Sequence, residues 1–351
     1  MISKLTAASC AALLGATLLA CGAPPGEGAD TPGSVTFVGW GGQGQEAMTT
    51  MFFEPFSEET GIGITQDTGS SPTKLAQMVD AGQVIWDVMD YGAEIGLTDN
   101  PDLEEIDCAV VACADFDEGL FPAYPQGVPL YVLGIVLTYN TDLVTEAPQT
   151  RADALFDTTT YPGKRAFNGI GGTYTSLLTT ALIADGVDQD ELYPLDIERA
   201  LRKIETIRDD IIVYQESSQC VNLVASGEAV FGDCYNGRAK LARDEGLPID
   251  YIWSQQALVA DYVMVPRGTP NRENAMQLVA YLTDRENSGR FSELMAYAGG
   301  NPHATVDEEF RENSPIENAG DGVHRPVPPG LDWWPDNRET VIDRMAEWFN
   351  E

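Results

Sequence analysis

The sequence predicts an α/β protein in which short apolar strands alternate with amphipathic helices around mainly parallel sheets. Three observations lead to this fold class. Short apolar stretches rich in β-branched residues recur along the chain, and segments with helical spacing of apolar residues separate them. The 351 residues, 43% of them hydrophobic, can also form a sizeable core, and no internal repeat or low-complexity block interrupts them. Disordered and collagen-like chains are therefore excluded.

The elements follow from this pattern in chain order. Strand 35–38 ends at Trp40 and leads into a helix over 45–60. A long apolar run over 128–139 is rich in β-branched residues and predicts an extended strand. The remaining predicted strands are 62–66, 86–89, 229–232, 249–253 and 261–265. The remaining predicted helices are 73–81, 177–184, 197–207, 221–226, 271–283, 289–298 and 338–350.

The chain is strongly acidic. Lys and Arg total 20 against 55 Asp and Glu, which gives a formal net charge of −35. Such a surface repels a phosphate backbone, so nucleic acid is excluded as a partner. The acidity has two interpretations, steering of cationic ligands or adaptation to salt. The acids are spread over the whole chain, which favours adaptation to salt.

The N-terminus is typical of an export signal. In residues 1–20 the only charge is Lys4, and an apolar stretch over 11–20 follows. The segment is too short to span a membrane. Its ending Leu18-Leu19-Ala20-Cys21 predicts a bacterial lipobox, with Cys21 as the lipid-bearing residue and 21–33 as a Pro- and Gly-rich tether. An ordinary signal peptide with an incidental Cys is the alternative.

Four cysteines belong to the folded part, and an exported location lets them form disulfides. Four cysteines allow three pairings. We favour Cys108 with Cys113 and Cys220 with Cys234, because each pair is local. A zinc site is the alternative, but the spacings are not CxxC and no His is close in sequence.

Motifs for catalysis are weak. GQGQEA at 42–47, with Asp67 further on, has the form of a dinucleotide-binding turn, but exported proteins rarely meet such cofactors. Ser71-Pro72-Thr73-Lys74 fits S-x-x-K without the companion motifs, so Ser71 is better explained as a helix cap. His303 and His324 are the only histidines, and both lie in loop-like surroundings. We therefore expect no catalytic residue, no metal and no cofactor.

A different set of residues predicts a ligand site. Trp40 ends the first strand, Tyr235 and Arg238 lie close together, and Asp261 begins a predicted strand. Open α/β sheets bind ligands at strand carboxyl ends. Aromatic faces attract alkylammonium groups, and a carboxylate supplies a charge partner, so these residues predict an aromatic box with one anion and one cation.

The order of motifs resembles the spermidine/putrescine-binding family of periplasmic solute-binding proteins from ABC importers, from about residue 35 to the C-terminus. The landmarks are GWGG at 39–42, WDV at 86–88, VP at 128–129, YNTD at 139–142, ASGE at 225–228, YNGR at 235–238, PID at 248–250, DYVMVP at 261–266 and DWWPDNR at 332–338. The resemblance implies a type II fold of two α/β lobes, 34–140 plus 262–302 and 141–261 plus 303–351. Crossing strands would join the lobes around a ligand cleft, which closes by a hinge motion.

The resemblance also implies roles for particular residues. Trp40 would form a wall of the pocket, and Tyr235 takes the place of a Trp that stacks on the ligand. Asp261 matches the carboxylate that binds an amine of the ligand. Tyr297 matches an aromatic residue on the opposing lobe. The segment Gly92–Glu94 corresponds to a further ligand-facing loop.

Two departures from the family pattern concern the second amine of a polyamine. Residues 168–174, NGIGGTY, contain no acid, and Arg238 stands where diamine binders can carry one. A cation there repels a second ammonium, unless Glu94 compensates. An ω-amino acid such as 4-aminobutyrate fits better, with its ammonium on Asp261 and its carboxylate on Arg238. A surface or interlobe ion pair is the alternative role for Arg238.

We therefore expect a monomeric, lipid-anchored binding protein outside the cytoplasmic membrane that delivers a polyamine or an ω-amino acid to an ABC permease. The alternatives are a binding protein of the same fold for an iron chelate, thiamine or a sugar, and an exported α/β enzyme.

Overall fold

The computed structural model describes residues 33–170 and 174–350. The predicted signal peptide, Cys21 and nearly all of the predicted tether lie outside these residues. Within the described part of the chain, no helix is both long and apolar enough to cross a membrane.

The described strands form one sheet in the order β2-β1-β3-β8-β4-β7-β5-β6, with β9 paired to β4. The pairs among β1, β2 and β3 and among β5, β6 and β7 are parallel, whereas β4 pairs with β7, β8 and β9 antiparallel and β3 with β8 antiparallel. The strands are β1 Ser34–Gly39, β2 Gly63–Thr68, β3 Val88–Gly92, β4 Val128–Asn140, β5 Arg165–Asn168, β6 Ile211–Tyr214, β7 Phe231–Tyr235, β8 Ile249–Met264 and β9 Ala298–Gly299.

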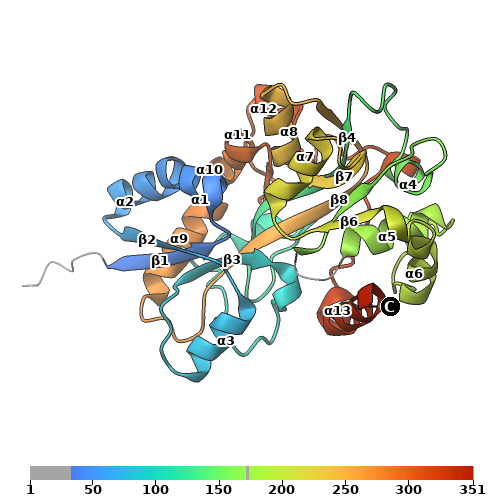
Figure 1. Cartoon of the computed structure of the whole chain (residues 1–351). Coiled ribbons are helices and arrows are strands. Elements are labelled where there is room, and N and C mark those ends of the chain that lie inside the picture. Colours follow the sequence, from blue (N-terminus) through green and yellow to red (C-terminus); the bar gives the residue numbers. More distant parts are fainter. Residues whose placement is uncertain (1–32, 171–173, 351) are drawn as a thin grey trace, which may run out of the picture. The chain divides into compact units, whose positions relative to one another are not determined.

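The prediction of mainly parallel sheets is wrong for the middle of the sheet. The central strands β4 and β8 run antiparallel side by side, from Val128 opposite Val263 to Asn140 opposite Ile249 (Figure 1). Every residue of β4 is buried. An antiparallel strand is usually recognised by the alternation of polar and apolar residues. Because β4 is buried on both faces, it lacks this alternation, and its sequence is typical of a parallel strand.

The two predicted strands 249–253 and 261–265 form a single strand, β8, and Asp261 therefore lies inside a strand instead of beginning one. Two glutamines between the predicted strands are buried and bonded to neighbouring segments: Gln255 Oε1 accepts from Ala152 N, and Gln256 Nε2 donates to Pro315 O.

Most predicted helices are present. The helix predicted over 45–60 begins at Gly42 and continues through a π-helical turn, η1. The helix predicted over 289–298 is wrong at its end, because Ala296 adopts φ 56° and Ala298 pairs with β4 in β9. The helices are α1 Gly42–Met48, η1 Thr49–Phe53, α2 Glu54–Thr60, α3 Pro72–Asp80, η2 Ala93–Ile95, η3 Cys113–Phe116, α4 Arg151–Phe156, α5 Thr175–Ala184, η5 Gln189–Glu191, α6 Ile197–Glu205, η6 Arg208–Asp210, α7 Ser217–Ala225, α8 Asn236–Asp244, α9 Arg272–Thr283, α10 Arg285–Gly289, α11 Phe291–Met295, α12 Glu308–Arg311, η7 Gly322–His324 and α13 Trp334–Asn350.

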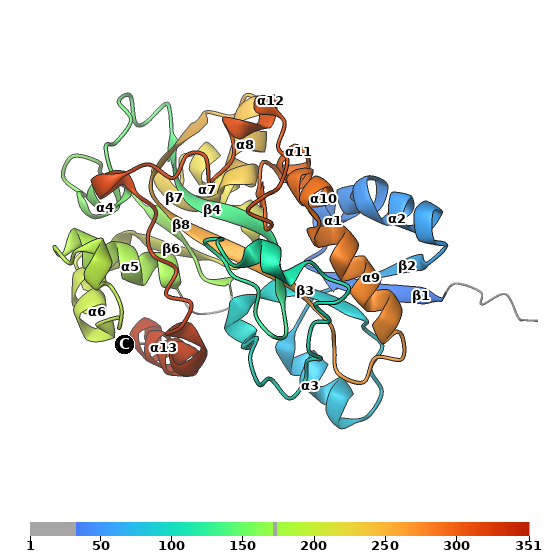
Figure 2. The same cartoon turned by 180° about the vertical axis from the view of Figure 1, so that it is seen from behind.

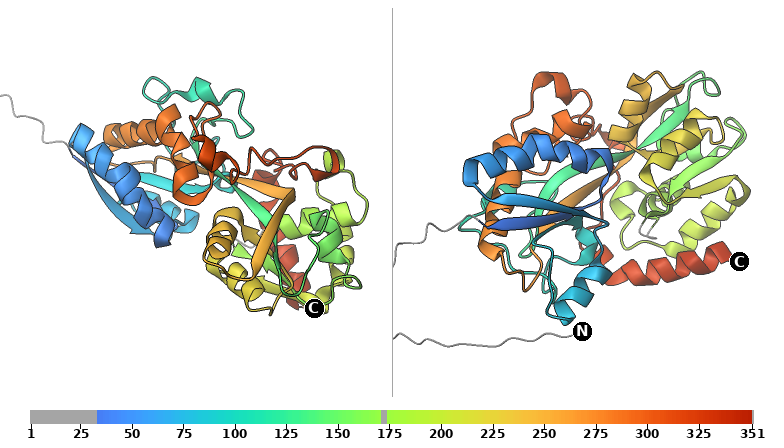
Figure 3. Two further views of the ribbon diagram at one scale, coloured as in Figure 1. Left: turned by 90° about the horizontal axis from the view of Figure 1, so that it is seen from above. Right: turned by 60° about the vertical axis from the view of Figure 1, so that its left-hand side comes forward.

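Buried apolar side chains gather at both ends of this sheet. Phe37, Phe52 and Trp86 belong to the clusters around β1, β2 and β3, where α9 packs against β1, β3 and β4 (Figure 2). Phe167 and Phe231 belong to a cluster around β5 and β7, on which α5 and α6 pack together. The last helix, α13, contacts η2, so the C-terminal segment reaches the neighbourhood of β3 (Figure 3).

The four cysteines of the folded part form two disulfides. Cys108 is bonded to Cys113, and Cys220 is bonded to Cys234, which is the local pairing favoured by the sequence. The second disulfide joins α7 to β7 and is fully buried. It thereby fixes the strand that ends at Tyr235.

Candidate ligand-binding site

Three adjacent strands bring two acids and a tyrosine together. In the β4–β8 register Tyr131 lies opposite Asp261, and in the β3–β8 register Asp90 lies opposite Val263. Asp261 and Val263 are two residues apart, so their side chains and those of their partners point to one face of the sheet. Asp90, Tyr131 and Asp261 therefore meet on that face, although 130 residues of chain separate the last two.

Asp261 is held by two donors. Its Oδ2 accepts from Trp40 Nε1 at 2.8 Å and from Tyr131 Oη at 2.8 Å. The residue is only 7% exposed, and burial raises the pKa of its carboxyl, while the hydrogen bonds from Tyr131 and Trp40 lower it. Its Oδ1 accepts no hydrogen bond from the described residues and remains available to a ligand donor.

Aromatic rings surround this carboxylate. Trp40 stacks on Tyr91 with 5.1 Å between ring centroids, and Tyr297 stacks on Tyr131 at 5.4 Å. The indole of Trp40 keeps 46% of its residue surface exposed, which leaves a face for a ligand. Tyr235 Oη accepts from Asn168 Nδ2 at 2.9 Å, and burial raises the pKa of Tyr235 to about 12.

Two cavities adjoin the carboxylate, and we name them by their charged residues. The Arg238 compartment has a volume of about 320 Å³ and the Glu94 compartment about 230 Å³. A water molecule takes about 30 Å³ in the liquid, so either compartment can hold a small aliphatic ligand. Both compartments are lined by Trp40, Ile170, Tyr235, Val259 and Asp261.

Arg238 is positioned by the start of α8. A Cβ on the preceding Gly237 would lie 2.2 Å from Met295 O, so only glycine allows α8 to approach α11 this closely. Among the described residues Arg238 has no hydrogen-bond or ion-pair partner, although it lines a cavity together with Asp261. A guanidinium in this position is suited to an anionic ligand group.

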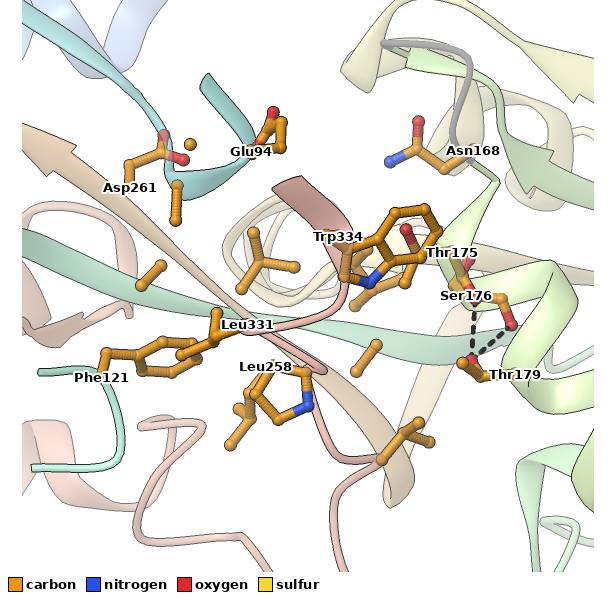
Figure 4. Close-up of a pocket in the computed structure, with 18 of the residues that line it drawn as sticks. Glu94, Phe121, Asn168, Thr175, Ser176, Thr179, Leu258, Asp261, Leu331 and Trp334 are labelled. Carbon is orange, nitrogen blue, oxygen red and sulfur yellow. Dashed lines mark hydrogen bonds between the residues drawn. The ribbon is translucent and has the colours of Figure 1, made fainter. Parts of the chain in front are cut away.

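The Glu94 compartment is acidic at one end and lined by neutral polar groups at the other. Figure 4 shows Glu94 and Asp261 on one side, Asn168 and the hydroxyl-bearing residues of α5 on the other, and Trp334 between them. Burial raises the pKa of Glu94, Asp261 raises it further, and Arg338 lowers it.

The structure brings all seven residues predicted for the ligand site to these two cavities. Trp40, Tyr235 and Asp261 line both. The Arg238 compartment adds Arg238 and Tyr297, and the Glu94 compartment adds Gly92 and Glu94.

Sequence reasoning missed several lining residues. Asp90 and Tyr131 carry no motif of their own, and Asn168 begins the segment 168–174 that was noted only for its lack of an acid. The pairing of Tyr131 with Asp261 could have been found only from the register of β4 against β8. Trp334 was part of a recognised family ending, but nothing in the sequence places that ending against the site.

Comparisons with known proteins agree with this geometry. Residues 52–318 match the family described as bacterial extracellular solute-binding protein. The chain is 30% identical, over 90% of both chains, to the gamma-aminobutyric acid-binding protein of Pseudomonas aeruginosa. It is 26% identical to the spermidine/putrescine-binding periplasmic protein of Escherichia coli over 106 residues, 30% of each chain.

Solved structures extend the similarity to the fold. The structure of a GABA receptor, Atu4243, superposes with a TM-score of 0.82 at 32% identity over 90% of this chain and 97% of that one. The PBP AgtB of A. tumefaciens R10, in complex with agropinic acid, superposes with a TM-score of 0.78 at 27% identity over 91% and 99%. This chain therefore belongs to the bacterial extracellular solute-binding protein family, has its two-lobed α/β fold, and is a substrate-binding protein of an ABC transporter.

Proposed function

We propose that the protein captures an ω-amino acid such as 4-aminobutyrate in the Arg238 compartment. The ammonium binds Asp261, the carboxylate binds Arg238, and the methylenes lie against Trp40, Tyr235 and Tyr297. One observation carries the proposal: among the described residues, the Asp261 carboxylate keeps one oxygen without a hydrogen bond, the Arg238 guanidinium has no ion-pair or hydrogen-bond partner, and both groups line the same cavity.

The charges of the compartment favour a zwitterion over a diamine. Charge-assisted hydrogen bonds to Asp261 and Arg238 would compensate both ligand charges for the water they lose. A diamine of similar length would place its second ammonium beside Arg238, where like charges repel. One relative and one solved structure named for gamma-aminobutyric acid support the same class of ligand.

A polyamine is the second candidate, and the Glu94 compartment favours it. Glu94 and Asp261 line that cavity together, so a diamine could place one ammonium at each. The raised pKa of Glu94 and its proximity to Arg338 make it a weaker partner for an ammonium than an exposed carboxylate. We therefore place the ω-amino acid first.

The N-terminal segment supports a proposal about location. We propose that residues 1–20 direct export, that Cys21 carries a lipid anchor, and that residues 21–33 tether the monomeric protein near its permease. We also propose that the two lobes comprise 34–140 plus 262–302 and 141–261 plus 303–351, and that their closure traps the ligand.

A thermal-shift screen of the purified protein tests the ligand. A ligand that binds the native state raises the Tm by mass action. We expect 4-aminobutyrate to raise it more than putrescine or spermidine at equal concentration. A larger shift with either polyamine, abolished by Glu94→Gln, would replace the first proposal by the second. No shift with any of the three would contradict both.

A further inference from the structure

Asp90 presents a problem of hydrogen counting. Tyr131 Oη lies 2.8 Å from Asp261 Oδ2 and 3.1 Å from Asp90 Oδ2. A tyrosine hydroxyl carries one hydrogen and can donate it to only one of two acceptors. If both carboxyls were ionised, one of these two contacts would join oxygens with no hydrogen between them.

The surroundings of Asp90 offer no other compensation for a charge. The residue is 3% exposed, and its Oδ1 is buried without a hydrogen-bond partner in the described part of the chain. No basic side chain among the described residues acts on its carboxyl. A buried, unpaired carboxylate costs far more than a neutral acid with one unpartnered carbonyl oxygen.

We propose that Asp90 is protonated in the folded protein and donates its hydrogen to Tyr131 Oη, which in turn donates to Asp261. The two acids then carry one negative charge, located on Asp261. Burial and the repulsion from Asp261 raise the pKa of Asp90, in agreement with this arrangement.

This inference rests on the proposed ligand site and deepens it, because it sets the number of charges that the site presents. A site with one net anion matches one ammonium, whereas two ionised acids side by side would favour a dication. Asp90 is therefore a positioning residue that acts on the ligand through Tyr131 and Asp261 and selects ligands with a single amine at this position.

Several other charged or titratable groups stand on the elements packed around Asp90. None is an ion-pair partner of Asp90 in the described residues. Tyr131 lies on β4 and Asp261 on β8. Tyr297, Arg238 and Glu216 line the same compartment. Arg272 and Glu273 lie on the first turn of α9. Strand β1, on the other side of β3, carries no titratable side chain.

The test compares Asp90→Asn with the wild type in the absence of ligand. In the unfolded chain Asp90 releases its proton near its ordinary pKa of about 3.9, so the wild type takes up a proton on folding at neutral pH. Its stability therefore falls relative to that of D90N as the pH rises above about 4. Urea unfolding from about pH 4 to about pH 8 should show D90N gaining stability over the wild type throughout this range. A difference independent of pH would overturn the proposal.

Asp87 supplies a matched control on the segment just before β3. It is equally buried, but its carboxylate accepts hydrogen bonds from Thr36 N at 2.7 Å and from the side chains of Thr269 and Asn271. An asparagine at this position would place its NH₂ group against the donors that now bond to the carboxylate. Asp87→Asn should therefore be less stable than the wild type at neutral pH, whereas D90N should be more stable. If both variants were destabilised alike at neutral pH, Asp90 would be ionised, and the proposal would be overturned.

Two further measurements separate this proposal from the choice of ligand. ¹³C NMR of the wild-type aspartate carboxyl groups should show one that stays protonated at neutral pH and is absent from D90N, whatever the protein binds. With 4-aminobutyrate as the probe, the wild-type affinity should rise relative to D90N as the pH increases. A loss in D90N of about tenfold or more at neutral pH, about 1.4 kcal/mol, would mean that Asp90 already contributes a charge.

Discussion

Replacing Arg238 by methionine should separate an amino-acid site from a polyamine site. Methionine keeps most of the apolar stem and removes the charge. Because Arg238 makes no hydrogen bond or ion pair with the described residues, the substitution leaves no protein group without its partner. We therefore expect a Tm close to that of the wild type, together with a specific change in binding.

The magnitude follows from the contact that is lost. A hydrogen bond to a charged group contributes about 1.5–3 kcal/mol. The affinity for 4-aminobutyrate should therefore fall roughly 10- to 150-fold. Putrescine should bind as well as before or better, since a repelling cation has been removed from the cavity.

Isothermal titration of each ligand into wild type and R238M measures both effects. Arg243→Met is the matched control on the same helix: Arg243 lies 3.4 Å from Asp250, stacks on Tyr251 and lines neither compartment. It should leave both affinities unchanged. The assignment would be refuted if R238M bound 4-aminobutyrate as tightly as the wild type, or if it lost both ligands equally.

Three further predictions concern stability. Replacing both Cys220 and Cys234 by alanine should lower the free energy of unfolding by about 3 kcal/mol, as expected for a closed loop of about 15 residues, in a urea titration. Tyr131→Phe leaves two buried carboxyls without their bridging hydroxyl and should cost about 1–3 kcal/mol in the same assay; no change would mean that the hydroxyl does not bridge them. Arg285 lowers the pKa of Asp115 to about 2. The ion pair between them therefore stabilises the fold above about pH 4, and this contribution is lost as the pH falls towards 2. Arg285→Ala should remove this small acid-dependent part, so the difference in stability from the wild type should be present above about pH 4 and should shrink as the pH falls towards 2.

Local sequence signals were enough to predict most helices and the parallel strands β1, β2 and β3 at one end of the sheet, but they missed the short strands β5 and β6 at the other end. The centre of the sheet was harder, because β4 is buried throughout and Gln255 interrupts the apolar pattern of β8. Gln255 adopts φ 59° and its side chain bonds to α4 and η7, so tertiary contacts decide its conformation. No local rule would have joined the two halves of β8.

The candidate site shows the same division. Trp40, Arg238 and Asp261 could be proposed because motifs and charge mark them. Asp90 and Tyr131 could not, since each is an ordinary strand residue whose importance comes from the register of β3 and β4 against β8. Predicting them requires strand pairing over more than a hundred residues.

The most direct test of the proposed function is a crystal structure of the protein with 4-aminobutyrate. We predict the ligand nitrogen at about 2.7–2.9 Å from an Asp261 carboxylate oxygen and its carboxylate at a similar distance from the Arg238 guanidinium. Ligand density in the Glu94 compartment, or a ligand carboxylate turned away from Arg238, would contradict the account.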